Sequence, residues 1–169
     1  MTTRVRDIVD ADAPAILALN LESEAVLSPM DAARYAHLRS QAAYARVVED
    51  DGAVVAFLLA FREGADYDSV NYRWFDAAFD TFLYVDRVVV ARSHQGRGLG
   101  PLLYDDLFAF ARAAGLPRVT CEFDIEPPNE ASRRFHARYG FAEVGTQALP
   151  GGKRVSLQSA DVRGAAVRA

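Results

Sequence analysis

Three glycines within six residues mark the stretch of this sequence that is best suited to binding a ligand. They lie between Gln95 and Gly100, directly after a run of apolar, β-branched residues that predicts a buried strand. Apolar residues then recur at helical spacing, at Leu99, Leu103 and Leu107. Because the first amides of a helix lack intrahelical partners and carry the positive end of its dipole, this turn predicts a phosphate or pyrophosphate ligand.

The side chains of the turn narrow the kind of nucleotide site. Arg97 can add a charged hydrogen bond to a phosphate, whereas Pro101 has no N–H to offer. A P-loop would need Gly-Lys-Ser/Thr here, and a dinucleotide-binding turn would need a third glycine where Pro101 stands. What remains is a Gln-x-x-Gly-x-Gly pattern on Gln95, Gly98 and Gly100. A purely structural turn is the alternative interpretation.

The composition predicts one globular domain with a well-buried core, since 51% of the 169 residues are hydrophobic. The formal charge is -4, and acidic and basic residues are mixed along the chain, so the sequence shows no basic cluster that would favour nucleic-acid binding. The single cysteine, Cys121, excludes an internal disulfide and is expected to be a core residue rather than a catalytic one. His37 and His94 lack metal-ligand spacing. No apolar run approaches the length of about 18 residues that spans a membrane. We expect a cytoplasmic protein without a metal.

Periodicity and turn residues predict the elements that must position the glycine turn. One domain is expected over residues 1–160, with a frayed tail at 161–169. The expected strands are Thr3–Val9, Tyr44–Val48, Ala53–Phe61, Phe82–Val90, Arg118–Ile125, Phe141–Leu149 and Lys153–Gln158, with a hairpin at Asp51-Gly52. A first helix is expected from Asp10 or Asp12 to Ala25, with an apolar stripe of Ile16, Leu17, Leu21 and Ala25. Further helices are expected from Asp31 to Ser40, from Leu99 to Ala114, and from Asn129, which can cap the helix, to Gly140.

The glycine turn resembles the acyl-coenzyme A pyrophosphate loop of the GNAT N-acetyltransferase superfamily, with Gln95, Gly98 and Gly100 on its fixed positions. A second motif of the family follows one strand later, on Asn129, Ser132, Phe135, His136, Gly140 and Phe141. The Phe-His pair and the stretch Asn71–Phe75 also resemble a bacterial branch of the superfamily. The resemblance covers nearly the whole chain and implies the GNAT α/β fold, a mixed sheet of about seven strands flanked by about four helices.

The resemblance also implies acetyl-coenzyme A as cosubstrate and names the residues that would bind it. The pantetheine arm would pair with backbone groups of Val88 and Val90, and the Val89 amide is a candidate donor to the thioester oxygen. The full set of implied cofactor-binding residues is Val88, Val89, Val90, Gln95, Gly96, Arg97, Gly98, Leu99, Gly100, Pro101 and Asn129.

Acetyl transfer to an amine needs a base that removes a proton from the nucleophile. The family's strand carboxylate maps to Glu122 when counted from the start of the strand, and to Asp124 when counted back from Asn129. We favour Glu122, with Asp86 as a third choice, and a water can relay the proton. The alternative is that these carboxylates are paired with arginines such as Arg87 and Arg118.

The departing thiolate needs an acid, and the family usually places tyrosine where this sequence has His136. A histidine with an ordinary pKa of about 6.5 can donate a proton near neutral pH. The alternative is a histidine that only packs or caps. Tyr139 projects from a different face of the helix and replaces His136 poorly.

The stretch from Arg62 to Asp80 is rich in aromatic residues but shows no clear period. Long loops of this kind often bind substrates, so we expect it to cover the acceptor site. Its candidate substrate-binding residues are Tyr67, Tyr72, Trp74 and Phe75. An equally weighted alternative is a satellite hydrophobic cluster that packs beneath the loop.

Together these features predict an acetyl-coenzyme A-dependent N-acetyltransferase that acts by direct attack of a primary amine. We expect a small-molecule amine, with a peptide or protein N-terminus as second choice, and neither nucleic acid nor membrane as a partner. A non-catalytic acyl-coenzyme A binding or sensing module is the alternative from another class. A third interpretation is a mononucleotide-binding domain. A homodimer is expected only by analogy with other folds of this size.

Overall fold

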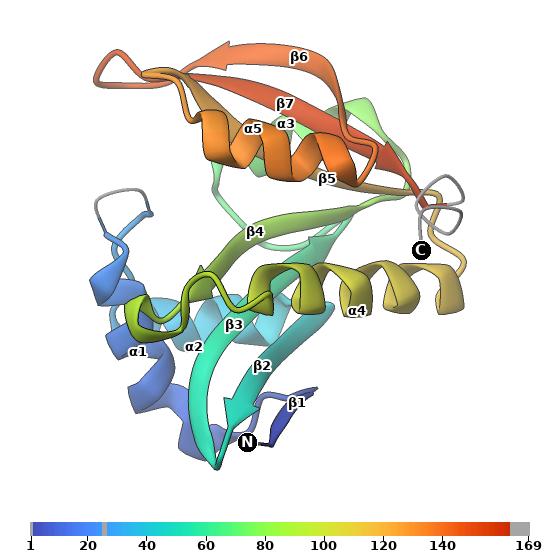
Figure 1. The fold of residues 1–169 in the computed structure, drawn as a ribbon. Coiled ribbons are helices and arrows are strands. Elements are labelled where there is room, and N and C mark those ends of the chain that lie inside the picture. The colour runs from blue at the N-terminus through green and yellow to red at the C-terminus, as the bar shows by residue number, and fades with distance from the viewer. Residues whose placement is uncertain (1, 25–26, 163–169) are drawn as a thin grey trace. The chain divides into compact units, whose positions relative to one another are not determined.

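The computed structural model describes residues 2–24 and 27–162, which form seven strands and five α-helices (Figure 1). The strands are β1 (Thr3–Asp7), β2 (Tyr44–Asp50), β3 (Ala53–Arg62), β4 (Leu83–Val90), β5 (Arg118–Glu126), β6 (Ala142–Ala148) and β7 (Arg154–Asp161). The helices are α1 (Ala13–Glu22), α2 (Ala32–Gln41), α3 (Val70–Ala78), α4 (Leu99–Ala113) and α5 (Glu130–Arg138). Short 3-10 turns at Asp10–Asp12 and Arg92–His94 complete the described elements.

The strands form one mixed sheet in the order β1-β2-β3-β4-β5-β7-β6. β4 and β5 run parallel, whereas the pairs β1–β2, β2–β3, β5–β7 and β6–β7 are antiparallel. Parallel neighbours need a crossover connection, which α4 supplies between β4 and β5. The mixed α/β sheet expected from the sequence is confirmed, and α3 is one helix more than the sequence indicated.

The chain divides into two compact units. Unit 1 comprises Met1–Phe61 and Val85–Leu107, and unit 2 comprises Arg62–Tyr84 and Phe108–Ala169. β4 passes from unit 2 into unit 1 after Tyr84, and α4 passes from unit 1 into unit 2 after Leu107. The glycine turn therefore belongs to unit 1, whereas the β5 carboxylates and α5 belong to unit 2.

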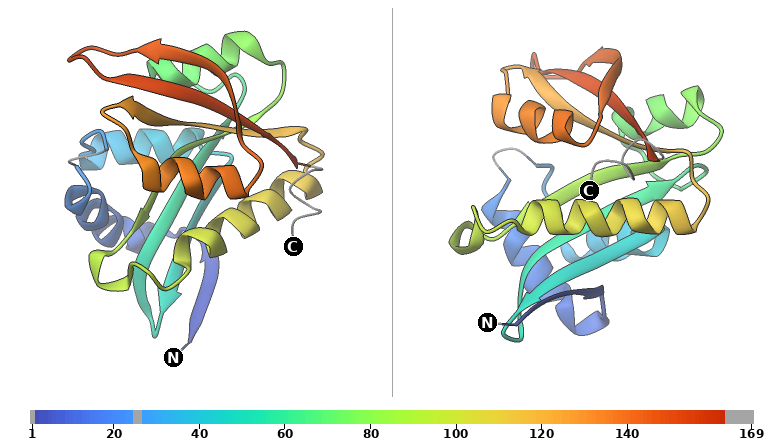
Figure 2. Two further views of the ribbon diagram at one scale, coloured as in Figure 1. Left: turned by 45° about the horizontal axis from the view of Figure 1, so that its top comes forward. Right: turned by 45° about the vertical axis from the view of Figure 1, so that its right-hand side comes forward.

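Unit 1 places α2 on one face of the β2–β3 hairpin and the start of α4 on the other face (Figures 1 and 2). Asp51 and Gly52 close the hairpin with φ values of 49° and 84°, as the Asp-Gly pair predicts. β3 is buried from Val55 to Phe61, which explains why its sequence is continuously apolar rather than alternating.

Two side chains of β2 fix the middle of α4 against the sheet. The Tyr44 hydroxyl donates to Asp106 over 2.7 Å, and the Arg46 guanidinium donates to the same carboxylate oxygen over 2.8 Å. Tyr44 and Arg46 lie two residues apart and therefore point to the same face of the sheet. This face supports the helix that follows the glycine turn.

Unit 2 packs α3 and α5 against opposite faces of its strands (Figure 2). The alternation along β5 explains the arrangement, because neighbouring residues of a strand point to opposite faces. Phe123 contacts the His136 ring of α5 with a centroid separation of 5.7 Å. On the other face, Tyr84 of β4 contacts Tyr72 and Phe75 of α3 at 5.7 and 5.6 Å.

The segment from Arg62 to Asp80 is not the irregular loop that the sequence led us to expect, because nine of its residues form α3. The Ser69 side chain caps this helix by accepting from the Tyr72 amide over 3.2 Å. Tyr72, Phe75 and Phe79 are three and four residues apart, which is helical spacing. The high aromatic content suggested a binding loop, although the spacing of the aromatic residues is helical.

The apolar stripe expected on α1 is also corrected. The helix buries Ile16, Leu19 and Asn20, whereas Leu21 is 67% exposed. Asn20 is buried where Leu21 was expected to be, because the Asn20 side-chain amide donates a hydrogen bond to the Ser28 carbonyl over 3.2 Å. Ala25, the last residue of the expected stripe, lies outside the described residues.

The end of the chain is ordered slightly further than expected. β7 extends to Asp161, and the buried Val162 donates its amide to the Pro117 carbonyl over 3.1 Å. A frayed tail beginning at residue 161 is therefore wrong for these two positions. Residues 163–169 lie outside the described part of the chain.

Candidate functional site

The glycine turn, Gln95–Pro101, joins β4 to α4 in unit 1. Gly96 and Gly98 adopt φ values of 80° and 79°, the left-handed conformation that L side chains disfavour. Apart from the adjoining residues, no atom in the described part of the chain lies within 4 Å of the place that a Cβ would take at either glycine. The requirement for glycine is therefore conformational rather than steric. Residues 95–98 are exposed, so the loop is open to a ligand.

The main-chain amides of the turn have the character of an anion site. Within residues 2–24 and 27–162, the next backbone donor after the Gln95 amide is that of Leu102, which bonds the Gly98 carbonyl over 3.1 Å. The amides of Gly98, Leu99 and Gly100 thus lie at the start of α4 with no hydrogen-bond acceptor among the described residues. These donors and the helix dipole fit a diphosphate, such as that of coenzyme A.

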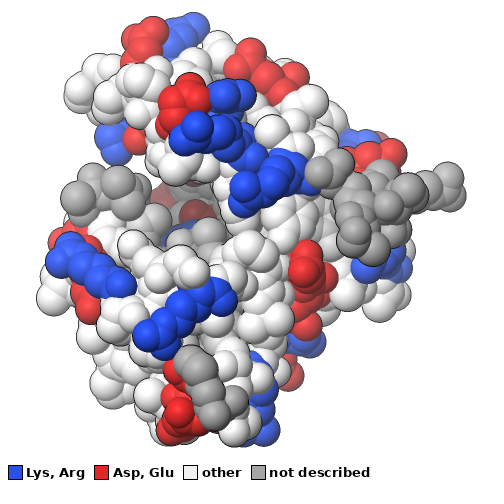
Figure 3. Space-filling model, viewed as in Figure 1, with Lys and Arg blue, Asp and Glu red and all other residues white. Residues whose placement is uncertain are grey.

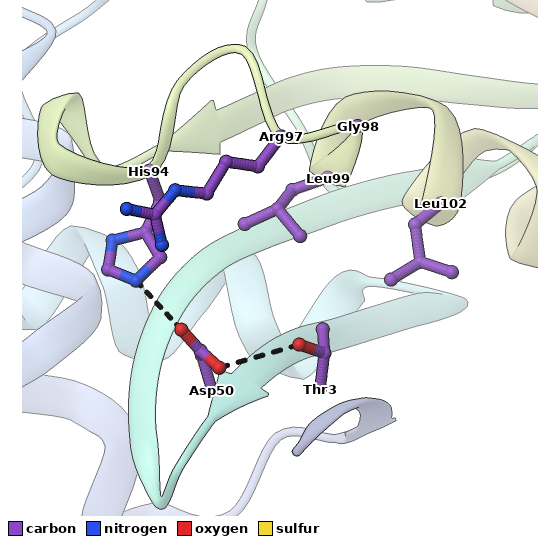
Figure 4. A pocket seen from close by; sticks show the side chains of 7 residues that line it. All are labelled: Thr3, Asp50, His94, Arg97, Gly98, Leu99 and Leu102. Atoms are coloured by element: carbon purple, nitrogen blue, oxygen red, sulfur yellow. Dashed lines mark hydrogen bonds and ion pairs between the residues drawn. The ribbon is translucent and has the colours of Figure 1, made fainter. Parts of the chain in front are cut away.

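The residue that precedes the turn tethers it to β2 (Figure 4). His94 Nε2 lies 2.9 Å from Asp50 Oδ2, and the Thr3 hydroxyl donates to the other carboxylate oxygen over 3.4 Å. Thr3, Asp50 and His94 line a pocket of about 710 Å³, and its remaining lining residues are Arg97, Gly98, Leu99 and Leu102. The tether fixes the start of the turn by a side-chain contact that the sequence did not reveal.

Asp86 is held in an ion pair beside the predicted cofactor strand. Its Oδ2 accepts from Arg87 Nε over 2.6 Å, and the two side chains are only 5% and 4% exposed. Arg87 also donates to Asn20 Oδ1 over 2.9 Å and to the Ser28 carbonyl over 3.3 Å. The arginine-paired alternative therefore describes Asp86. Along the same strand, Val89 is buried while Val88 and Val90 are half-buried.

The two β5 carboxylates contact different side chains in unit 2. Glu122 Oε1 accepts from the Tyr84 hydroxyl over 2.6 Å. Asp124 lies 3.6 Å from Lys153 Nζ. Arg118, a neighbour on the strand, lies instead over the Phe79 ring at 4.1 Å.

His136 is surrounded by aromatic rings on the face of β5 opposite to Glu122. Its ring lies 5.7 Å from that of Phe123 and 5.2 Å from those of Phe135 and Phe141. The side chain is buried, and Nδ1 lies 2.7 Å from the Ser132 carbonyl. Because a carbonyl can only accept, Nδ1 carries the proton. Burial lowers the pKa of His136, and the Ser132 carbonyl opposes that effect only partly.

The two predicted proton-transfer groups are thus not brought together within unit 2. Glu122 faces α3, whereas His136 packs on Phe123, the next residue of β5, from the side of α5. The lowered pKa also means that the imidazolium form of His136 is less populated at neutral pH than its ordinary value implies.

Asn129 and Cys121 have clear structural surroundings. Asn129 Oδ1 accepts from the Ser132 amide over 3.1 Å, so this residue is the N-cap that the sequence predicted for α5. Cys121 is buried, and burial followed by the charge of Glu122 raises the pKa of its thiol. The prediction of a core cysteine is confirmed.

The four aromatic residues proposed to bind substrate differ in accessibility. Tyr67, Tyr72 and Phe75 are buried, with Tyr72 bonded through its hydroxyl to the Arg62 carbonyl over 2.6 Å. These contacts correspond to the packing alternative. Trp74 keeps part of its surface, and its ring lies so close to β6 that a Cβ at Gly145 would meet it at 2.7 Å.

Sequence analysis missed Tyr84 and Asp50. Tyr84 stands beside Thr120 in the parallel register of β4 and β5, which places its hydroxyl within reach of Glu122. Strand periodicity marked Tyr84 as a core residue but gave no partner across the sheet. Asp50 was assigned to a turn between strands, and only the fold brings it to His94.

The described surface shows mixed charge. In Figure 3, acidic and basic side chains are interspersed, and basic side chains gather over α5, where Arg133, Arg134 and Arg138 are exposed. Among the described residues, no group of His, Cys, Asp and Glu is arranged to hold a metal ion. Over the same residues, each helix is too short or too polar to cross a bilayer.

A mixed α/β sheet in which a parallel strand leads through a left-handed glycine turn into a helix defines a class of protein that binds phosphate-bearing cofactors. Comparison with known proteins is more specific. Residues 6–141 match the model of the acetyltransferase (GNAT) family. This chain belongs to that family.

Individual relatives agree with this membership. The chain is 51% identical to phosphinothricin N-acetyltransferase of Streptomyces coelicolor over 59 residues, which are 35% of this chain and only 33% of the relative. The match thus spans a third of the length of that relative. Ard1 from Thermoplasma volcanium matches with a TM-score of 0.78 at 15% identity, covering 95% of this chain and 98% of that one.

A further structure contains a cofactor. The structure of yncA from Salmonella typhimurium with its cofactor acetyl-coenzyme A matches with a TM-score of 0.72 at 20% identity, covering 96% of this chain and 95% of that one. At these identities the solved structures establish the fold of this chain.

Proposed function

We propose that this protein is an N-acetyltransferase that transfers the acetyl group of acetyl-coenzyme A to the primary amine of a small molecule. The observation that carries the proposal is the glycine turn, because the first amides of α4 have no hydrogen-bond acceptor among the described residues. The chain that contains this turn belongs to the GNAT family. The presence of acetyl-coenzyme A in the yncA structure supports the choice of cosubstrate. A peptide or protein N-terminus is the second choice of acceptor.

In this proposal unit 1 holds the cofactor. The amides of Gly98, Leu99 and Gly100 would bind the pyrophosphate, and Arg97, which forms no ion pair with any described residue, would add a charged hydrogen bond. Backbone groups of Val88 and Val90 would bind the pantetheine arm. Acetyl-coenzyme A, when bound, supplies the acetyl group as a thioester.

Glu122 is our proposed base. It is preferred over Asp86, which is buried in an ion pair with Arg87, and over Asp124, which lies beside Lys153. Glu122 takes one proton from the ammonium group, which releases the nitrogen lone pair. That lone pair forms the C–N bond as the C–S bond breaks. The second proton of the nitrogen ends on sulfur, and Glu122 returns its proton to solvent.

We propose that His136 shuttles this second proton rather than donating one that it already holds. Its Nδ1 proton is engaged by the Ser132 carbonyl, and burial keeps the ring neutral near pH 7 because it lowers the pKa of His136. Nε2 must therefore take up a proton before it can give one to the thiolate.

The acceptor is proposed from two observations. The relative from Streptomyces coelicolor is named for phosphinothricin, which makes this amine the first to test. Trp74 is the half-exposed member of the four aromatic residues and is the best candidate among them for contact with an acceptor. A single domain over residues 1–160 acting in the cytoplasm, with a homodimer by analogy, is part of the same proposal.

Titration calorimetry with acetyl-coenzyme A, followed by a thiol-release assay over a panel of amines that begins with phosphinothricin, tests the proposal. We expect binding and amine-dependent release of thiol. Binding without release for any amine would favour the sensing module. Preferential binding of ATP would favour a mononucleotide domain. Glu122→Gln should lower turnover more than it changes the Kd for acetyl-coenzyme A, and His136→Ala should do the same.

A further inference from the structure

Tyr84 makes a short and well-defined contact with the proposed base. Its hydroxyl donates to Glu122 Oε1 over 2.6 Å. Hydrogen bonds from O–H groups to ionised carboxylates have this length, about 2.5–2.7 Å. The two residues lie 38 positions apart in the sequence and meet because β4 and β5 pair in parallel, with Tyr84 beside Thr120.

The position of the Tyr84 hydroxyl is set by α3. The Tyr84 ring is 1% exposed and lies edge-on to Tyr72 and tilted against Phe75, at 5.7 and 5.6 Å. Tyr72 is itself fixed, since its hydroxyl donates to the Arg62 carbonyl over 2.6 Å and accepts from the Ala65 amide over 2.9 Å. A ring packed in this way cannot swing its hydroxyl away from Glu122.

A neighbouring hydroxyl provides a contrast. Thr120 lies beside Tyr84 and two residues before Glu122, so its side chain points to the same face of β5. Thr120 Oγ1 is buried and has no hydrogen-bond partner among the described residues. The Glu122 carboxylate thus accepts a hydrogen bond from the Tyr84 hydroxyl and not from the Thr120 hydroxyl.

We propose that Tyr84 is a positioning residue that holds the Glu122 carboxylate ionised and in one orientation for proton abstraction. The inference rests on the proposed function in its assignment of Glu122 as base. It also gives the aromatic segment of residues 62–80 a role: α3 buttresses Tyr84, which in turn orients the base. The segment acts through the protein interior.

Other charged groups around Glu122 must be considered in any pH experiment. Asp124 lies two residues further along β5, with Lys153 at 3.6 Å from its carboxylate. Cys121 is the preceding residue, and burial raises the pKa of its thiol, which keeps the thiol neutral. On β7, the residue opposite Glu122 is Leu157, which carries no charge.

Three substitutions test the inference in the full chain. Tyr84→Phe removes the hydroxyl and keeps the ring, Glu122→Gln removes the base, and Thr120→Val is the matched control that removes the adjacent hydroxyl. We expect Tyr84→Phe to lower kcat for the amine about ten-fold while KM for acetyl-coenzyme A stays within about two-fold. Thr120→Val should retain the kcat of the parent protein.

The double variant separates positioning from packing. If Tyr84 acts through Glu122, adding Tyr84→Phe to Glu122→Gln should cause no further loss of kcat, because residues that act as a unit are not additive. Additive losses, or a Tyr84→Phe variant that turns over like Thr120→Val, would overturn the inference.

A measurement that needs no turnover keeps the inference distinct from the proposed function. Protein labelled with 13C at glutamate Cδ is titrated by NMR, with Glu122→Gln used to assign the signal. Loss of a donor to the charged form disfavours that form, so Tyr84→Phe should raise the midpoint of the Glu122 titration by about half a pH unit or more. An unchanged midpoint overturns the inference. A parent protein that is inactive with every amine but shows the shift would refute only the proposed function.

Discussion

His136 Nδ1 lies 2.7 Å from the carbonyl oxygen of Ser132, one helical turn earlier in α5. The contact and the burial of the ring together favour a neutral imidazole, and burial lowers the pKa of His136 below the ordinary value of about 6.5. An unfolded chain therefore binds a proton at His136 more readily than the folded chain does.

The pH dependence of stability follows from this difference. The contribution of neutral His136 to the free energy of unfolding is fully present above about pH 6.5 and is lost as the pH falls from there through the folded-state pKa. We expect His136→Gln to flatten the dependence of the urea midpoint on pH between about 5 and 8. His37→Gln is the control and should follow the parent protein. Equal slopes in all three proteins would contradict the prediction.

Asn129 caps α5 and Asp31 caps α2, so Asp31 is a control for the part of any Asn129 effect that comes from helix capping alone. Asn129 accepts from the Ser132 amide over 3.1 Å, and Asp31 accepts from the Arg34 amide over 2.8 Å. Replacement of either by alanine should lower the free energy of unfolding by about 1 kcal/mol, because each variant loses one N-cap. Only Asn129→Ala should also weaken acetyl-coenzyme A binding by calorimetry. Equal cofactor affinity in both variants would restrict Asn129 to capping.

Substitution of Gly98, before α4, and of Gly115, after α4, separates an effect on the glycine turn from a general loss of stability. Both have positive φ, 79° and 72°. At neither position does an atom of a described residue, other than the chain neighbours, lie within 4 Å of the place that a Cβ would take. Alanine at each should introduce strain of about 1–2 kcal/mol, measurable as a similar fall in the urea midpoint. Gly98→Ala alone should raise the Kd for acetyl-coenzyme A, by about ten-fold if the strain displaces the turn. An identical rise for Gly115→Ala would show a general loss of stability.

The His94–Asp50 contact predicts an effect on cofactor binding through the tether. His94→Ala removes the 2.9 Å contact to Asp50, and a part-buried hydrogen bond of this kind is worth about 1 kcal/mol. We expect a several-fold rise in KM for acetyl-coenzyme A with kcat at saturation nearly unchanged. Ser93→Ala, which removes the 2.8 Å partner on the other ring nitrogen, is the control. A loss of kcat in His94→Ala at saturating cofactor would assign this residue a different role.

Cys121 should be inert in the folded protein. The thiol is buried, and burial, followed by the charge of Glu122, raises the pKa of Cys121, so thiolate is scarce at neutral pH. The thiolate of Cys121 attacks DTNB to form a mixed disulfide, and the reagent releases one thionitrobenzoate. We expect about one equivalent of thionitrobenzoate per chain in urea and almost none without it. Rapid native labelling at pH 7.5 would show that the thiol is accessible.

Local patterns in the sequence were sufficient for the elements and the glycine turn. The spacing of Gly98 and Gly100 and the leucine period behind them predicted a strand, turn and helix that the structure confirms. The Asp-Gly hairpin and the Asn129 cap were also predicted correctly, since their geometry depends only on neighbouring residues. The segment around Trp74 was the exception, because its composition suggested binding while its period was helical.

Only the tertiary structure decided which side chains control the candidate catalytic groups. Tyr84 meets Glu122 across 38 residues of sequence, and Asp50 meets His94 across 44, through strand pairing and chain crossing that no local period encodes. The protonation of His136 likewise depends on burial among rings from several elements. The sequence by itself determined an acyltransferase scaffold with a glycine turn that is a candidate phosphate site. Packing between distant segments determined the environment in which its candidate acid–base residues lie, because desolvation and hydrogen bonding are set by three-dimensional neighbours.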